Sequence, residues 1–311
     1  MLRFVADKSR MLLLPFKSSS RCLAALVFLA LFALLPGASA AIAVKSGDKI
    51  AFLGDSITAG GWGNPAGYVH LVIAGLAANG VHAEAVPAGV SGHKSNQMLE
   101  RLDRDVLSKK PQWMTLSCGV NDVWHGKNGV ALDEAMAAKG DYTLKPGEDR
   151  GTYKKNISQI IEKAQAAGVK PVILTATVIH EELESPENVK LVPYNDFLRE
   201  LAKEKHLPIA DLNALFQKRI KAENKPGTKV LTGDGVHMNA EGNKLMATGV
   251  LEALGLSAAE MKKAQESWAP LEVQAQEAAK KAAEAKAKAD EAKKAAKPAD
   301  STAKPLVPAA K

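Results

Sequence analysis

Cysteine is nearly absent from this chain of 311 residues, which contains only Cys22 and Cys118. Cys22 falls in an N-terminal segment with the features of a leader that is cleaved. A mature chain would then keep one thiol and could form no internal disulfide. We therefore expect stability to come from a packed core rather than from covalent cross-links.

Long apolar runs are also scarce, and the one that occurs, residues 22–35, follows a segment with five basic residues and one acid. It is followed by Pro36-Gly37-Ala38-Ser39-Ala40. A basic segment, a short apolar core and an Ala-x-Ala site predict a secretory signal peptide, residues 1–40. The run is shorter than the roughly 20 residues that cross a bilayer, with an uncleaved anchor as the alternative. We expect export, to the periplasm or the extracellular space.

Excess charge of one sign is missing from residues 41–270. The formal net charge of +7 comes from the basic leader and from residues 271–311, which hold nine lysines and six acids. Without a basic stripe, residues 41–270 are not expected to bind nucleic acid. Residues 271–311 are rich in Ala, Lys and Glu, which predicts an exposed helix or a disordered tail. The basic surplus of this tail could support weak contact with anionic envelope polymers, although a solvated spacer is the simpler interpretation.

Short apolar runs alternate with helical periodicity through residues 41–270, the predicted domain. This alternation predicts an α/β domain with a parallel sheet flanked by helices. Strands are expected at 50–53, 83–86, 113–118, 171–176 and 208–212. Helices are expected to be capped by Ser95 and Asn239, and another to begin at Pro193. Residues 123–150 are polar and aperiodic, and are expected to form an inserted loop region.

Polar residues with catalytic chemistry follow the predicted strands. The first strand runs into Gly54-Asp55-Ser56-Ile57-Thr58, the second into Gly89, and the third into Gly119 and Asn121. Asp234-Gly235-Val236-His237 precedes the last core helix. Because the carboxyl ends of parallel strands meet at one edge of a sheet, these segments are expected to converge there.

The convergent residues have the roles that acyl transfer needs. A serine hydroxyl needs a base, and His237 is the candidate, oriented by Asp234 three residues earlier. Negative charge developing on a carbonyl oxygen needs donors, for which Ser56, Gly89 and Asn121 are available. Each motif alone is an ordinary turn or helix start. Their combination, rather than any one of them, predicts catalysis.

Other residues near the predicted site have two interpretations. Asp55 could tune charge beside Ser56 or form an Asx turn. His93 and His125 could contact substrate or be solvated loop residues. Cys118 is expected to be buried rather than nucleophilic.

One acidic segment resembles a metal site only superficially. His180, Glu181 and Glu182 follow the fourth strand without a further ligand at suitable spacing. A solvated turn is favoured there, and neither a metal nor a cofactor is predicted.

The blocks around Ser56, Gly89, Asn121 and His237 resemble, in order and spacing, the conserved blocks of the GDSL/SGNH hydrolase superfamily. The resemblance covers about residues 45–255. It implies a flavodoxin-like three-layer α/β/α sandwich with a five-stranded parallel sheet. It also implies that Ser56, His237 and Asp234 form a catalytic triad, with Ser56, Gly89 and Asn121 as the oxyanion hole. Pro87 departs from the pattern, because the family often has Asn there.

The expected function is therefore an exported serine esterase. Because the predicted domain has no net charge and few aromatic residues, we expect the substrate to be an acetylated carbohydrate, including polysaccharide, or a short-chain ester. A lysophospholipase or thioesterase-type lipid hydrolase is the alternative among enzymes. A non-catalytic glycan-binding envelope protein is the alternative outside them. Deleting residues 123–150 is expected to change substrate preference more than melting temperature.

Overall fold

The computed structural model describes residues 41–140, 142–223 and 227–295. The predicted signal peptide lies outside the described residues, as does the end of the tail, 296–311. The described chain from Ile42 onward belongs to one compact unit.

Five strands form one sheet in the order β2-β1-β3-β4-β5, and every neighbouring pair is parallel. The strands are β1 (Lys49–Gly54), β2 (Glu84–Gly89), β3 (Trp113–Ser117), β4 (Lys170–Leu174) and β5 (Ile209–Ala210). This order is that of flavodoxin-like folds, in which ligands bind where the strand order reverses, between the first and third strands. The predicted α/β sandwich with a five-stranded parallel sheet is confirmed.

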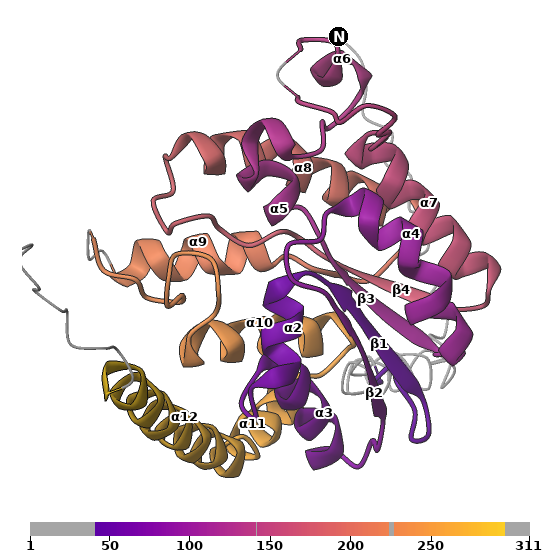
Figure 1. Ribbon diagram of the computed structural model, residues 1–311. Helices are drawn as coiled ribbons and strands as arrows, with labels where there is room; N and C mark the ends of the chain where they lie inside the picture. Colours follow the sequence, from indigo (N-terminus) through magenta and orange to yellow (C-terminus); the bar gives the residue numbers. More distant parts are fainter. Residues whose placement is uncertain (1–40, 141, 224–226, 296–311) are drawn as a thin grey trace, which may run out of the picture. The chain divides into compact units, whose positions relative to one another are not determined.

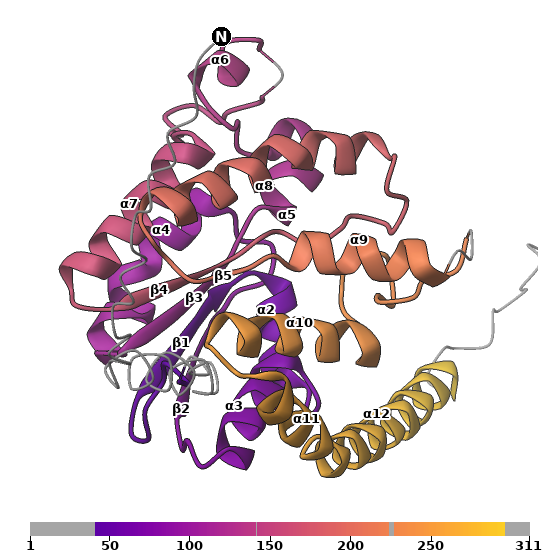
Figure 2. The same cartoon turned by 180° about the vertical axis from the view of Figure 1, so that it is seen from behind.

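Helices cover both faces of the sheet (Figures 1 and 2). One face carries α4 (Ser95–Asp105), α7 (Tyr153–Ala166) and α8 (Pro186–Glu204), with α5 (Val120–Trp124) against α8. The other carries α2 (Ser56–Gly63), α3 (Tyr68–Ala78) and α10 (Ala240–Ala253), with α9 (Leu212–Glu223) and α11 (Ala258–Glu266) beside them. Because helices cover both faces, the central strands are buried on both sides, as their continuous apolar sequences require.

Pro87 is explained by the position of β2 at the edge of the sheet. Gly54 pairs with Gly89, and the Val90 N–H donates to the Gly54 carbonyl at 3.0 Å. Backbone N–H groups alternate in direction along a strand, so those of residues 87 and 89 point away from β1. A proline at position 87 therefore costs the ladder no hydrogen bond, as is usual for proline in edge strands.

Two predicted helix starts are wrong. The helix expected to begin at Pro193 is α8, which begins at Pro186, with the Ser185 hydroxyl accepting from the Asn188 N–H. Pro193 lies inside this helix, near Val189, which is 61% exposed. A proline there removes one helical hydrogen bond on a side of α8 that water can reach.

Ser95 is the first residue of α4 rather than its cap, because its hydroxyl donates to Asp122. Asn239 caps α10 as predicted, accepting from the Gly242 N–H.

The segment 123–150 is not a separable insertion. A 3₁₀ element outside this segment, η1 (Leu107–Lys109), follows α4. The segment itself holds the short helix α6 (Glu134–Ala137) and the 3₁₀ element η2 (Gly126–Asn128). Its residues 130–132 are buried, and the N–H of Tyr153 donates to the Ala131 carbonyl at 2.8 Å. Deletion would remove part of the core, so a large fall in melting temperature is now expected, contrary to the sequence-based prediction.

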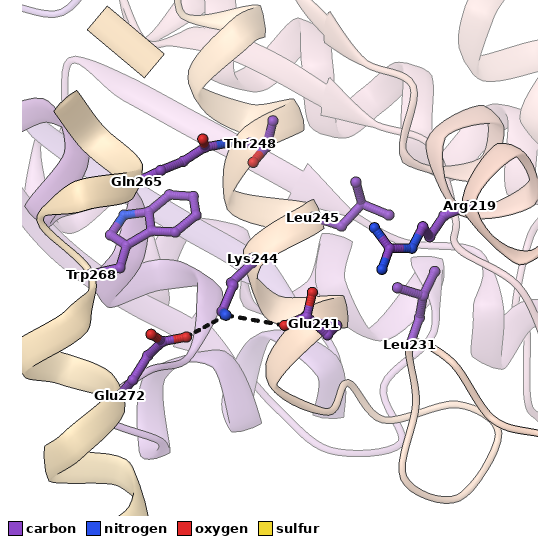
Figure 3. Close-up of a pocket in the computed structure, with 9 residues that line it drawn as sticks. All are labelled: Arg219, Leu231, Glu241, Lys244, Leu245, Thr248, Gln265, Trp268 and Glu272. Atoms are coloured by element: carbon purple, nitrogen blue, oxygen red, sulfur yellow. Dashed lines mark hydrogen bonds and ion pairs between the residues drawn. The ribbon is translucent and has the colours of Figure 1, made fainter. Parts of the chain in front are cut away.

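The start of the tail docks on the domain. Helix α12 (Ala269–Ala295) begins with Leu271 and Ala275 against the core. A pocket of about 330 Å³ lies beside its first turns, where Lys244 donates to Glu241 at 3.0 Å and to Glu272 at 2.5 Å (Figure 3). The pocket is lined by none of the predicted site residues.

Among the helices of the described residues, none combines the length and apolarity needed to cross a membrane.

Candidate active site

Ser56, His237 and Asp234 form one chain of hydrogen bonds at the carboxyl end of β1. The Ser56 Oγ lies 2.8 Å from His237 Nε2, and His237 Nδ1 lies 2.6 Å from Asp234 Oδ2. A carboxylate only accepts, so Nδ1 carries the ring proton and Nε2 accepts from the serine hydroxyl. This is the tautomer in which the imidazole can remove the proton from Ser56.

Asp234 is held in place by the turn that carries it. Its Oδ1 accepts from the backbone N–H groups of Val236 at 2.9 Å and of His237 at 2.8 Å. Partial burial raises the pKa of Asp234, but the hydrogen bonds from the His237 ring and from these backbone groups outweigh it and hold the pKa below its ordinary value. Asp234 therefore stays ionised and can stabilise an imidazolium beside it.

Glu181 anchors the loop that carries Asp234 and His237, and sequence reasoning missed it. Its carboxylate accepts from the N–H groups of residues 230–232 at 2.6 to 2.9 Å, and from the Thr232 hydroxyl. The His180 N–H also donates to the Gly235 carbonyl at 2.7 Å. The predicted solvated turn at 180–182 is confirmed for the exposed His180 and Glu182 but is wrong for Glu181, which is buried. Both His180 and Glu181 have positive φ, 67° and 58°, a conformation that costs energy in non-glycine residues.

Replacing Glu181 by glutamine should loosen this loop. A glutamine side chain keeps one carbonyl oxygen, but its NH₂ group would face backbone donors that now point at a carboxylate. Bonds to charged acceptors are worth about 1.5–3 kcal/mol each, so we expect a loss of about 2–4 kcal/mol of stability. We also expect kcat to fall at least about tenfold through misplacement of His237.

The neighbouring Glu182→Gln variant is the matched control for Glu181→Gln, because Glu182 is exposed. Thermal melts and kcat for a 4-nitrophenyl ester measure both effects. Equal values for the two variants would contradict the anchoring role.

The predicted oxyanion donors converge on the same edge of the sheet. Gly89 ends β2 and lies so close to the start of α2 that a Cβ would be 2.3 Å from the Ala59 nitrogen. Gly119 precedes α5 with a φ of 131°, which favours glycine, and brings Asn121 into the first turn. Asn121 is buried and uses one N–H of its amide on the His93 carbonyl at 3.2 Å. The catalytic role of these donors stays a prediction.

A cluster of buried acids lies behind the serine. Asp55 caps α2 by accepting from the Ile57 N–H at 2.9 Å, which is the Asx-turn role. Burial raises the pKa of Asp55 to about 7, although the Ile57 N–H lowers it, and Asp122 adds to the rise. Asp122 accepts from the N–H and hydroxyl of Ser95, yet burial raises its pKa as well. Cys118 is buried as predicted, and burial raises the pKa of its thiol.

The stability of the protein should depend on the ionisation of Asp55. With a pKa raised to about 7, the folded state holds a proton that the unfolded chain releases near pH 4. Stability from this group is therefore fully present below about pH 4 and is lost as pH rises towards 7. Asp55→Asn keeps the oxygen that accepts from Ile57 without titrating. Between pH 4.5 and 8 the variant should gain about 3 kcal/mol relative to the wild type in urea unfolding. Parallel pH curves would refute the expectation.

His93 and His125, predicted as substrate contacts, both lie beside Asn121. The His93 carbonyl holds the Asn121 amide, and its Nδ1 accepts from Arg101 at 3.1 Å. His125 follows the last residue of α5. Burial lowers the pKa of both rings, and nearby cations lower it further. Both are therefore placed at the site as neutral rings, and contact with substrate stays a prediction.

Comparison with known proteins places this geometry in context. A model of the GDSL-like Lipase/Acylhydrolase family matches residues 52–245. Acetylxylan esterase of Geobacillus stearothermophilus is 26% identical over 226 residues, 68% of this chain and 96% of that protein. Its structure, that of Axe2, superposes with a TM-score of 0.55 at 22% identity, covering 69% of this chain and 97% of the other. The structure of an acetyl xylan esterase, AlAXEase, is 30% identical with a TM-score of 0.54, over 66% and 98% of the two chains.

Proposed function

This chain belongs to the GDSL-like lipase/acylhydrolase family, and on that premise we propose that it hydrolyses carboxylic esters through Ser56. The observation that carries the proposal is the continuous hydrogen-bonded chain from Ser56 through His237 to Asp234. A hydroxyl, an imidazole and an ionised carboxylate in this order are the parts of an activated serine nucleophile.

The reaction would run in two halves. His237 Nε2 takes the proton as the Ser56 Oγ attacks the ester carbonyl, and Asp234 stabilises the imidazolium. The carbonyl oxygen becomes negative and is stabilised by the N–H groups of Ser56 and Gly89 and by the Asn121 amide. Collapse breaks the ester bond, and His237 gives its proton to the leaving alcohol. Water then attacks the acyl-serine with His237 again as base, which releases the acid and restores Ser56.

The proposed substrate is an acetylated carbohydrate or another short-chain ester. Support comes from the acetylxylan esterases to which the chain is similar. The site is also open: the side chains of His237 and Asp234 are 44% and 57% exposed. Trp124, on the same helix as Asn121, is 37% exposed and could lie against a sugar ring. An open, polar site suits a bulky polar alcohol better than a long acyl chain.

A substrate panel tests this proposal against its alternatives. Acetylated xylo-oligosaccharides, 4-nitrophenyl esters of increasing chain length and lysophospholipids are compared, with Ser56→Ala as the blank. Preference for acetyl esters of sugars supports the proposal, and preference for long acyl chains replaces it with a lipid hydrolase. Wild-type protein that neither turns over an ester nor reacts with a fluorophosphonate probe would be a binding protein.

Export is part of the proposal. It is supported by the sequence of residues 1–40 alone, which lie outside the described structure. Expression of the full chain in a bacterial host, fractionation and N-terminal sequencing test it. A mature protein outside the cytoplasm that begins at Ala41 supports cleavage, and an intact N-terminus in the membrane fraction would indicate an anchor.

A further inference from the structure

Arg101 is a buried cation directly behind the predicted oxyanion donors. It lies on α4, and its side chain is only 3% exposed. Its guanidinium donates to the carbonyls of Gly54 and Ala88, both at 2.8 Å. It also donates to His93 Nδ1 at 3.1 Å and to Asp105 at 3.1 Å. An arginine on an amphipathic helix normally reaches water, so this burial needs an explanation.

The Ala88 carbonyl and the Gly89 N–H belong to the same peptide group. A cationic donor on the carbonyl oxygen therefore polarises the peptide whose N–H is predicted to face the substrate oxygen. That N–H points away from β1, at the open edge of the sheet, so the strand ladder does not use it. The backbone of α2 packs so closely against Gly89 that it also restricts the position of this residue. Arg101 is thus placed where it can hold the orientation of this donor and strengthen it.

Arg101 also supports the second donor. Its Nε–H holds the His93 ring, and the His93 carbonyl in turn holds the Asn121 amide at 3.2 Å. Its bond to Gly54 fixes the peptide that leads into Asp55 and Ser56. The Arg101 guanidinium therefore contacts one group next to each predicted donor. These groups are the Gly54 carbonyl before Ser56, the Ala88 carbonyl before Gly89, and the ring of His93, whose carbonyl binds Asn121.

The charge of Arg101 is only partly neutralised. Its sole carboxylate contact among the described residues, Asp105, is shared with Arg104, which donates to it at 2.6 and 3.1 Å. Two guanidiniums thus compete for one carboxylate, and Arg101 is the buried one. Positive charge that remains in a buried position acts on the site at reduced screening.

We propose that Arg101 is a positioning residue of the oxyanion hole, which aligns and polarises the Gly89 and Asn121 donors from behind. The proposal rests on the proposed ester hydrolysis. Because the negative oxygen exists only in the transition state, the loss of Arg101 should lower kcat and leave KM nearly unchanged. The donors themselves remain, so the loss should be smaller than the roughly 100- to 1000-fold seen when a donor is removed.

Three variants test the proposal. Arg101→Met should lower kcat about 10- to 100-fold with KM within about threefold. Arg101→Lys keeps the charge but cannot make every bond, so it should recover part of the loss. Arg104→Met is the matched control and should keep wild-type kcat, because Arg104 bonds the same Asp105 from an exposed position.

Binding of phenylboronic acid separates positioning from a merely structural role. Its adduct with Ser56 places a negative oxygen in the same hole, so Arg101→Met should weaken its affinity by the same factor as kcat/KM. Unchanged boronate affinity, or a loss of kcat equal to that of Arg104→Met, would overturn the proposal. If Arg101→Met does not fold, Arg101→Lys carries the same test. If the wild-type protein neither reacts with a fluorophosphonate probe nor turns over an ester, the proposed function fails together with this inference. If the wild type and Arg101→Met are equally active, only this inference fails.

Discussion

Replacing Ser56 by alanine should lower ester turnover by at least about 10⁴-fold and leave the fold intact. The Ser56 Oγ is the only nucleophile that His237 Nε2 contacts at hydrogen-bond distance among the described side chains. Its removal leaves the predicted donors of the oxyanion hole in place, which accounts for the small activity that should remain. Turnover of 4-nitrophenyl acetate, labelling by a fluorophosphonate probe and a thermal melt measure these effects.

Ser91→Ala is the matched control for this variant, because Ser91 is an exposed serine in the loop after Gly89. It should label and turn over like the wild type. Substantial residual activity in Ser56→Ala would mean that another group attacks the ester, and the proposed mechanism would be abandoned.

Loss of the base should be nearly as severe. His237→Ala removes the group proposed to accept the serine proton, and we expect a fall in kcat of at least about 10⁴-fold. Asp234→Asn should be milder by about tenfold or more, since the serine and histidine remain in contact and the Asn oxygen can still accept from residues 236 and 237.

Non-additivity distinguishes a catalytic role of His237 from general damage. Residues that act as one unit lose activity once, so Ser56→Ala combined with His237→Ala should be no worse than Ser56→Ala alone. His82→Ala, at an exposed histidine before β2, should keep full activity. Multiplicative losses in the double variant would show that the two side chains act independently.

The sheet could be predicted from the sequence because its signals are local. Continuous apolar runs such as 50–53 and 172–174 have few alternatives to buried strands once helices are seen between them. The convergence of Ser56, Asn121 and His237 follows from strand direction alone, since parallel strands end at one edge.

Helix boundaries were less accessible where two signals competed. Ser185-Pro186 is an ordinary helix start, yet Pro193 precedes a clearer apolar period, which favours the later start. The polarity of 123–150 likewise hid the buried apolar residues 130–132, because a short apolar run inside a polar segment carries no period.

Glu181 and Arg101 could not have been found in this way. Glu181 binds backbone N–H groups 49 to 51 residues away, and backbone groups leave no signature in a sequence. Arg101 binds backbone carbonyls of β1 and β2 through a helix that reads as amphipathic. Both side chains bind backbone carbonyl or N–H groups, which nearly every residue has. Only the folded structure therefore shows which backbone groups they bind.

The distance along the chain between Ser56 and His237 has a kinetic consequence. The two residues are separated by 181 positions, so the predicted nucleophile is synthesised early and the predicted base late. Contacts of such long range form slowly, after local helices are in place. During refolding, fluorophosphonate labelling should therefore appear after the circular dichroism signal of the helices has recovered. Labelling would thus report when the loop before α10, which carries His237, comes into contact with Ser56 at the end of β1.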